Sequence, residues 1–267
     1  MTTLPIKQYA LWDDVPPASS PEETFRPWLE TYTLDVDAPQ GAVLVCPGGG
    51  YANRAAHEAA PVARAFNDAG YHAFVVQYRV APHRHPEPLL DAARAIQIIR
   101  ERSAEWHVDL EHVAVCGFSA GGHLTASLGV HYDLEILYEN GLPDTTPCRP
   151  DALILGYPVI SAGVSRHAGS FKNLLGPDPS TAALALMSLE TQVTEATPPT
   201  FLWHTADDAS VPVENSLDFA AALRRHGVPF ELHVYPCGRH GLGLAPENPH
   251  IATWMDLCCA WLEDMGW

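Results

Sequence analysis

The chain has 267 residues, of which 47% are hydrophobic and 18% charged, a composition typical of a compact globular protein. Its formal net charge of −17, from 32 acidic against 15 basic side chains, disfavours binding to nucleic acid or to an anionic membrane surface. No apolar run is long enough to span a membrane, and we expect a single domain over residues 1–267.

The first 30 residues differ from the rest of the chain. They contain five prolines and little periodicity, so we expect an irregular segment that wraps the surface or forms an edge before the first strands near residues 31–36. They also lack the apolar stretch of a signal peptide. The six cysteines show no paired metal-ligand spacing and indicate reduced thiols, so we expect a cytoplasmic protein.

Beyond this segment, short apolar runs alternate with helical patterns. This alternation predicts an α/β fold with a mostly parallel central sheet and helices on both faces. The expected strands, in chain order, are residues 42–46, 73–78, 113–116, 152–155, 201–204 and 231–235. The expected helices are residues 56–69, 89–102, 123–130, 213–226 and 251–262. Residues 158–199 form a long connection, in which a helix over 181–191 is either a lid-like cap or an ordinary surface helix.

The first of these strands ends in Pro-Gly-Gly-Gly-Tyr at residues 47–51, which resembles the HGGG loop of esterases with proline in place of histidine. Because glycines carry no side chain, their backbone amides can approach an oxyanion closely. We therefore expect Gly49 and Gly50 to donate hydrogen bonds there, and Tyr51 either to stack on a sugar ring or merely to pack. A phosphate-binding loop is disfavoured, since neither GxGxxG nor a Lys-Ser/Thr ending is present.

The third strand leads into Gly-Phe-Ser-Ala-Gly at residues 117–121, and a helical pattern follows. A strand before and a helix after GxSxG are the context of the nucleophile elbow of α/β-hydrolases, a sharp turn that exposes a serine hydroxyl. This pattern predicts Ser119 as a nucleophile, with the amide of Ala120 as a further oxyanion donor.

A serine nucleophile needs a base to take its proton and an acid to orient that base. The fold predicts the order Ser, acid, His. The strand 201–204 leads directly to Asp207 and Asp208, and His240 lies in a glycine-flanked loop after the next strand. Many members of the fold carry the acid four residues after a strand-ending histidine, and His204 followed by Asp208 resembles that register. We therefore favour Asp208 as the acid and expect Asp207 to cap a turn or the helix near residue 212.

Together these motifs resemble the acetylxylan-esterase-like branch of the α/β-hydrolases. The resemblance runs from about residue 42 to 245 and also includes Tyr-Arg-Val-Ala-Pro at 78–82, Gly-Val-Pro-Phe-Glu-Leu-His at 227–233 and His-Gly-Leu-Gly at 240–243. It implies a carbohydrate esterase that removes small acyl groups. The absence of a secretion signal fits imported oligosaccharides better than polymeric xylan.

The predicted function is thus hydrolysis of short-chain acyl esters, acetyl esters above all, through an acyl-enzyme on Ser119 with His240 as base and Asp208 as acid. The partner is a small-molecule or oligosaccharide ester, and no metal or organic cofactor is expected. The histidine pairs at 83/85 and 107/112 lack a third ligand. A general carboxylesterase or lipase, a serine peptidase and, in another class, a non-catalytic binding protein are the alternatives. Whether the protein is a monomer or a homo-oligomer stays open.

Overall fold

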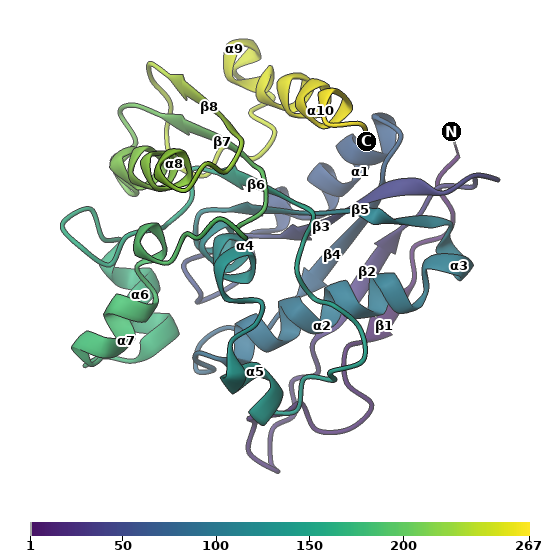
Figure 1. Ribbon diagram of the computed structural model, residues 1–267, viewed down its shortest axis with the longest axis horizontal. Coiled ribbons are helices and arrows are strands. Elements are labelled where there is room, and N and C mark those ends of the chain that lie inside the picture. The colour runs from purple at the N-terminus through teal and green to yellow at the C-terminus, as the bar shows by residue number, and fades with distance from the viewer. Residues whose placement is uncertain (1) are drawn as a thin grey trace.

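An eight-stranded sheet lies at the centre of the computed structural model, which describes residues 2–267 (Figure 1). In chain order the strands are β1 (Gln8–Ala10), β2 (Trp28–Tyr32), β3 (Gln40–Cys46), β4 (His72–Gln77), β5 (Val108–Phe118), β6 (Ala152–Gly156), β7 (Thr200–Thr205) and β8 (Phe230–Tyr235). Their order in the sheet is β1-β2-β4-β3-β5-β6-β7-β8. All neighbours from β4 to β8 pair in parallel, whereas β2 pairs antiparallel with both β1 and β4. The predicted mostly parallel sheet is confirmed.

Helices cover both faces of this sheet, as expected. The α-helices are α1 (Ala60–Asp68), α2 (Glu87–Glu101), α3 (Ser103–Trp106), α4 (Ala120–His131), α5 (Glu135–Glu139), α6 (Ala168–Leu175), α7 (Thr181–Leu186), α8 (Glu214–Arg225), α9 (Pro249–Ala252) and α10 (Trp254–Asp264). Two short 3₁₀ helices are η1 (Ala56–Glu58) and η2 (Leu189–Thr191). Figure 1 shows α1 and α10 on one face, and α2 and α4 on the other.

The apolar strands are explained by this two-sided cover. Val43 and Val45 of β3 pack in one cluster with residues of α1 and α10, whereas the alternate residues Leu44 and Cys46 pack with residues of α2 and α4. Because side chains alternate between the two faces of a strand, a strand buried on both faces needs a continuous apolar run. This is why the central strands can be recognised in the sequence.

The N-terminal segment is more regular than predicted. Residues 1–30 include β1, which is the edge strand, and the start of β2. The strand expected near residues 31–36 begins earlier, at Trp28, and ends at Tyr32. Its position is set by pairing with β4, in which Leu29 lies opposite Val76. Beyond it, Leu34 forms only an isolated bridge to Thr3.

Three predicted helices differ in their bounds. The helix expected over 56–69 is divided into η1 and α1 at Ala59. The helix expected over 123–130 begins at Ala120, because the turn at the end of β5 leads into it directly. The helix expected over 251–262 is divided into α9 and α10 at Thr253. Within residues 2–267, none of the helices combines the length and the apolar character that a bilayer crossing requires.

The long connection 158–199 contains α6, α7 and η2. Its side chains are partly built into the core, since Phe171 and Leu174 of α6 and Met187 after α7 are buried in the same cluster as α2 and α4. The expected helix over 181–191 is interrupted and ends at Leu186, followed by η2. The segment is therefore anchored against the helical layer at one face of the sheet.

Candidate active site

The turn between β5 and α4 holds Ser119 in a backbone conformation that is rare outside glycine. Its φ is 53° and its ψ is −119°, a combination that costs energy for an L-residue. A side chain at Gly117 would collide with the backbone of Gly121, and one at Gly121 would collide with the carbonyl oxygen of Cys46. The two glycines of the motif are thus required by close backbone contacts, which fix the serine at the carboxyl end of β5.

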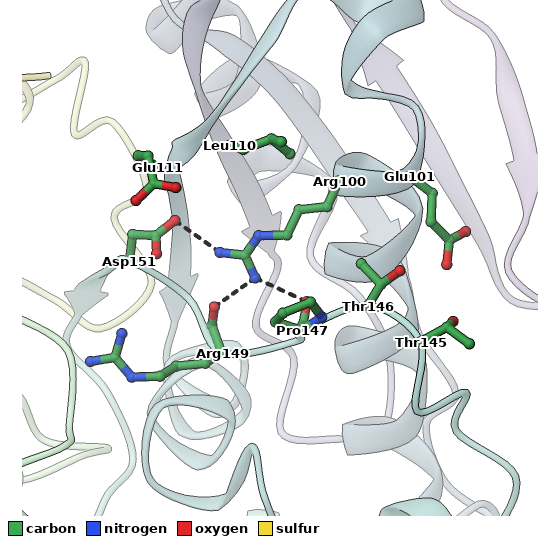
Figure 2. Close-up of a pocket in the computed structure, with 9 residues that line it drawn as sticks. All are labelled: Arg100, Glu101, Leu110, Glu111, Thr145, Thr146, Pro147, Arg149 and Asp151. Carbon is green, nitrogen blue, oxygen red and sulfur yellow. Dashed lines mark hydrogen bonds and ion pairs between the residues drawn. The ribbon is translucent and has the colours of Figure 1, made fainter.

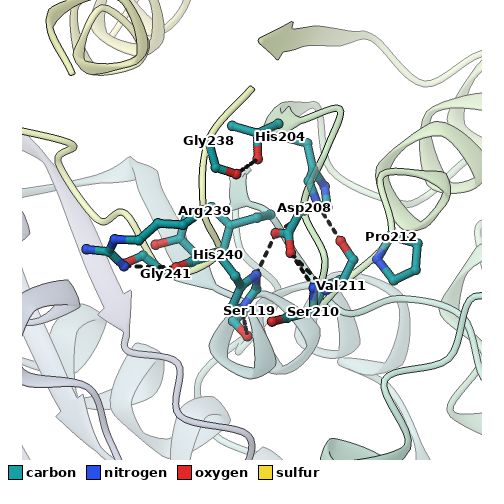
Figure 3. A network of polar contacts seen from close by, with 12 residues as sticks. Ser119, His204, Asp208, Ser210, Val211, Pro212, Gly238, Arg239, His240 and Gly241 are labelled. Atoms are coloured by element: carbon teal, nitrogen blue, oxygen red, sulfur yellow. Dashed lines mark hydrogen bonds and ion pairs between the residues drawn. The ribbon is translucent and has the colours of Figure 1, made fainter. Parts of the chain in front are cut away.

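Ser119, His240 and Asp208 come from three distant parts of the chain and are joined by hydrogen bonds (Figure 3). The Nε2 atom of His240 lies 2.8 Å from Oγ of Ser119. Its Nδ1 atom lies 2.6 Å from Oδ2 of Asp208. With the Nδ1–H donating to the carboxylate, the lone pair of Nε2 faces the serine hydroxyl, which is the tautomer that a general base needs.

Asp208 is held in an environment that favours its charged form. Its side chain is fully buried, and its Oδ1 accepts the backbone N–H groups of Ser210 and Val211 at 2.8 and 3.0 Å. Burial alone would raise the pKa of this carboxyl group, but the histidines His204 and His240 and the two amides outweigh it and hold the pKa well below its usual range. Asp208 therefore stays ionised across the neutral and mildly acidic range.

Asp207 has a different role from the one expected. It caps neither its own turn nor α8, since its Oδ1 accepts the backbone N–H of Gly238 at 2.7 Å. Gly238 opens the loop that carries His240, so Asp207 ties this loop to the end of β7. The sequence could not reveal this contact, because it joins residues that are 31 positions apart.

The glycine loop after β3 passes directly beside Ser119. A side chain placed on Gly48 would lie 3.0 Å from Cβ of Ser119, and the N–H of Gly48 itself is taken by Oε2 of Glu58 at 2.8 Å. Within residues 2–267, no protein acceptor pairs with the N–H groups of Gly49, Gly50 or Ala120. Unpaired donors beside a nucleophile are what an oxyanion site needs.

Tyr51 does not lie where a sugar could stack on it. Its side chain is only 1% exposed, and its hydroxyl group makes a 2.9 Å hydrogen bond with Nδ1 of His123 on α4. Of the two alternatives for Tyr51, stacking on a sugar or simple packing, this burial favours packing. The backbone at Tyr51 is left-handed, with φ of 57°.

Helix α6 adds polar groups to the site that sequence reasoning missed. Nδ2 of Asn173 donates to the carbonyl oxygen of Gly50 at 2.8 Å. Oγ of Ser170 lies 4.0 Å from the position that a Cβ atom on Gly50 would occupy. Because Asn173 and Gly50 are 123 positions apart in the sequence, no local sequence pattern predicts this contact. The segment 158–199 thus supplies a wall beside the glycine loop.

A hollow of about 530 Å³ lies at the opposite end of the parallel strands, around the amino-terminal end of β6 (Figure 2). Its central group is Arg100, which donates to the carbonyl oxygens of Pro147 and Arg149 and to Oδ2 of Asp151 at 2.8 to 3.0 Å. These groups satisfy one another. Across residues 2–267, moreover, no cluster of three or more His, Cys, Asp or Glu side chains is arranged to hold a metal ion.

Comparison with known proteins supports an assignment to a family. The BD-FAE family model matches residues 35–223. Endo-1,4-beta-xylanase B of Butyrivibrio fibrisolvens is 40% identical over 228 residues, which make up 84% of this chain and 36% of that protein. The acetylxylan esterase of Xylanibacter ruminicola is 31% identical over 235 residues, or 85% of this chain and 45% of that protein. The chain thus spans less than half the length of these curated relatives.

A solved structure agrees over nearly the whole chain. The acetyl ester-xyloside bifunctional hydrolase of Caldicellulosiruptor lactoaceticus superposes with a TM-score of 0.91 at 46% identity, covering 97% of this chain and 96% of that one. The similarity to acetylxylan-esterase-like proteins that the motifs predicted is thereby confirmed. The chain belongs to the BD-FAE family and has the α/β-hydrolase fold.

Proposed function

We propose that this protein is a carboxylic ester hydrolase that removes short acyl groups, acetyl above all, from xylo-oligosaccharides or related sugars. The observation that carries the proposal is the hydrogen-bonded series Ser119, His240 and Asp208 beside unpaired backbone donors. A binding protein built on the same scaffold would have no need of a strained serine aligned with a base and a buried acid.

In the proposed reaction, Oγ of Ser119 attacks the ester carbonyl carbon while Nε2 of His240 accepts the hydroxyl proton. The negative charge that develops on the carbonyl oxygen is met by the N–H groups of Gly49, Gly50 and Ala120. Collapse of this intermediate breaks the bond to the alcohol oxygen, which takes the proton from the histidine. Water, deprotonated by His240, then attacks the acyl-enzyme and releases the acid.

The substrate class is supported by the relatives and by the charge of the chain. Two similar proteins are named an acetylxylan esterase and an acetyl ester-xyloside hydrolase. A net charge of −17 favours neutral sugar esters over anionic ligands. The half-buried Asn173, whose Nδ2 holds the carbonyl oxygen of Gly50, places a polar side chain beside the glycine loop.

We further propose that residues 1–267 form one domain, that residues 158–199 cap the site and that the protein works in the cytoplasm. The last point rests on the six cysteines, all of which carry free thiols. It fits a substrate that has been imported as an oligosaccharide.

A substrate panel tests the proposal. It compares acetylated xylo-oligosaccharides, aryl acetates, aryl esters of longer acids and peptidyl substrates, each with the wild type and with Ser119→Ala. We expect acetyl esters to be hydrolysed fastest and Ser119→Ala, folded as judged by circular dichroism, to lose at least about 1,000-fold in kcat. Faster turnover of long-chain esters would favour a general carboxylesterase or lipase, and faster turnover of peptides would favour a serine peptidase; either result would contradict the proposed acetyl esterase.

A further inference from the structure

A buried carboxyl group connects the glycine loop with the loop that carries His240. Glu58, at the end of η1, is 2% exposed. Its Oε2 accepts the N–H of Gly48 at 2.8 Å, and its Oε1 accepts the hydroxyl group of Tyr157 at 2.6 Å. The same tyrosine oxygen accepts the N–H of Gly243 at 2.7 Å, three residues after His240. One side chain thus links the glycine loop to the loop that carries the histidine.

The neighbouring contacts strengthen this connection. Nε2 of His57 lies 3.0 Å from the carbonyl oxygen of Gly241. A side chain placed on Gly243 would lie 3.2 Å from the carbonyl oxygen of His57, so the two loops touch closely. The ring of Tyr157 stands edge to face against the ring of His240, with 5.0 Å between their centroids.

Tyr157 is also joined to the nucleophile turn. The residue before it, Gly156, accepts the N–H of Ser119 at 3.0 Å. Burial, followed by the charge of Glu58, raises the pKa of the Tyr157 hydroxyl well above its ordinary value. The tyrosine therefore remains a protonated donor at neutral pH.

The carboxyl group is costly for a purely structural role. Burying a carboxylate carries a desolvation penalty, and the ion-pair partner of Glu58 within residues 2–267 is the half-exposed His57, at 3.6 Å. Two short hydrogen bonds from neutral donors offset part of this penalty. An apolar side chain would fill the space at lower cost, but it would accept neither N–H nor O–H.

Glu58 also takes up the first amide of the glycine loop. Pro47 has no N–H group, and the N–H of Gly48 is directed to the carboxylate. This hydrogen bond orients the peptide plane before Gly49. Gly49, with φ of 123°, and Gly50, with φ of 64°, then turn the chain in conformations that favour glycine. The unpaired donors begin only after the amide that Glu58 holds.

We propose that Glu58 is a positioning residue, which keeps the oxyanion donors of the glycine loop and the His240 loop in one geometry through Gly48 and Tyr157. The inference rests on the esterase function proposed above. It predicts that the carboxyl group acts on the rate of acyl transfer more than on substrate binding, because both loops act on the transition state.

The test compares Glu58→Gln, Glu58→Ala and Tyr157→Phe with the wild type, with kcat and KM measured on an aryl acetate well below the Tm of each variant. Glu58→Gln keeps the shape but can accept only one of the two hydrogen bonds, so we expect kcat to fall about 10-fold while KM changes less than about threefold. Glu58→Ala is expected to lose about 100-fold and Tyr157→Phe about 10-fold. Because both groups act through one connection, the double variant Glu58→Ala with Tyr157→Phe should be hardly worse than Glu58→Ala alone.

A matched control is Tyr32→Phe, since the hydroxyl of this buried tyrosine donates to the carboxylate of Glu30 at the other end of the sheet. It should leave kcat unchanged. If Glu58→Gln and Tyr157→Phe both keep kcat within twofold of the wild type while their Tm falls, the carboxyl group is structural and the proposal is overturned. Should the Glu58 variants fail to fold, Tyr157→Phe decides by the same criterion. A wild type that hydrolyses no ester and resists a fluorophosphonate would instead overturn the proposed function, and this inference with it.

Discussion

Two polar clusters lie at opposite ends of the parallel strands, and they are built differently. At the carboxyl ends, Ser119, His240 and Asp208 form a hydrogen-bonded series (Figure 3). At the amino-terminal end of β6, Arg100 donates to Asp151 and to two backbone carbonyl oxygens (Figure 2). Both clusters are half buried or more, and both lie at the ends of central strands, so position and burial alone do not separate them.

What separates them is the state of their hydrogen-bonding groups. Arg100 has its guanidinium on three oxygen acceptors, an arrangement that stabilises the folded chain. Beside Ser119, the N–H groups of Gly49, Gly50 and Ala120 have no protein acceptor within residues 2–267. Donors left unpaired next to a nucleophile favour an incoming carbonyl oxygen. The comparison therefore predicts catalytic effects for variants at one end and effects on stability at the other.

The largest contrast is expected between two adjacent acids. Asp208→Asn should lower kcat by about 10,000-fold, because an amide at this place favours the wrong tautomer of His240. Asp207→Asn retains an oxygen that can accept the N–H of Gly238, so its loss should stay below about 10-fold. Steady-state kinetics on one aryl acetate measures both. Comparable losses of kcat at the two positions would contradict the assignment of Asp208 as the acid that orients His240.

The pH dependence of turnover sharpens the same assignment. Acidification should reduce kcat/KM as the imidazole of His240 takes a proton, since imidazolium cannot accept the serine proton. Protonation of Asp208 does not contribute to this loss of kcat/KM, because its pKa is held well below the usual range. Its lowered pKa contributes stability that is complete above the unfolded value of about 3.9 and is lost only as the pH falls further. A rate that is flat from pH 5 to 8 would speak against a histidine base.

A smaller effect is expected at the wall formed by α6. Asn173→Ala removes the 2.8 Å hydrogen bond to the carbonyl oxygen of Gly50 and should lower kcat/KM about threefold to 10-fold, the value of one hydrogen bond. The exposed Lys172 on the same helix is a matched control, and Lys172→Ala should change the rate by less than about twofold. If both variants behave like the wild type, α6 has no part in holding the glycine loop.

The smallest effect on activity is expected in the cluster around Arg100, at the amino-terminal end of β6. Arg100→Met leaves two carbonyl oxygens without this donor and Asp151 with only the N–H of Val113. It should cost about 1–3 kcal/mol of unfolding free energy, while kcat stays within about twofold of the wild type. Arg224→Met, at an exposed position of α8, serves as control and should change neither quantity appreciably. A loss of activity in Arg100→Met without loss of stability would erase the distinction between the two clusters.

The parts of this fold that could be predicted from sequence are those with a local cause. The central strands were recognised because burial on both faces requires continuous apolar runs, and β1 was missed because three residues at the edge leave no such pattern. The prediction of Ser119 rests on a motif whose glycines are required by close backbone contacts. Asp208 and His240 followed from their order and from the strands that precede them.

The rest depends on contacts between distant residues. The hydrogen bond between the buried Tyr51 and His123 spans 72 positions, and that between Glu58 and Tyr157 spans 99 positions. A single sequence holds no periodicity that relates such pairs. The same reason explains why Asp207 was expected to cap a turn, whereas it holds the loop that carries His240.

The central claim is that Ser119 is a nucleophile activated by His240, and covalent labelling tests it most directly. The wild-type protein is incubated with a fluorophosphonate, and the adduct is located by intact mass and peptide mapping. We predict a single adduct on Ser119, none in Ser119→Ala, and much slower labelling in His240→Ala. Absence of an adduct in wild-type protein, or ester hydrolysis that persists in Ser119→Ala, would contradict the claim.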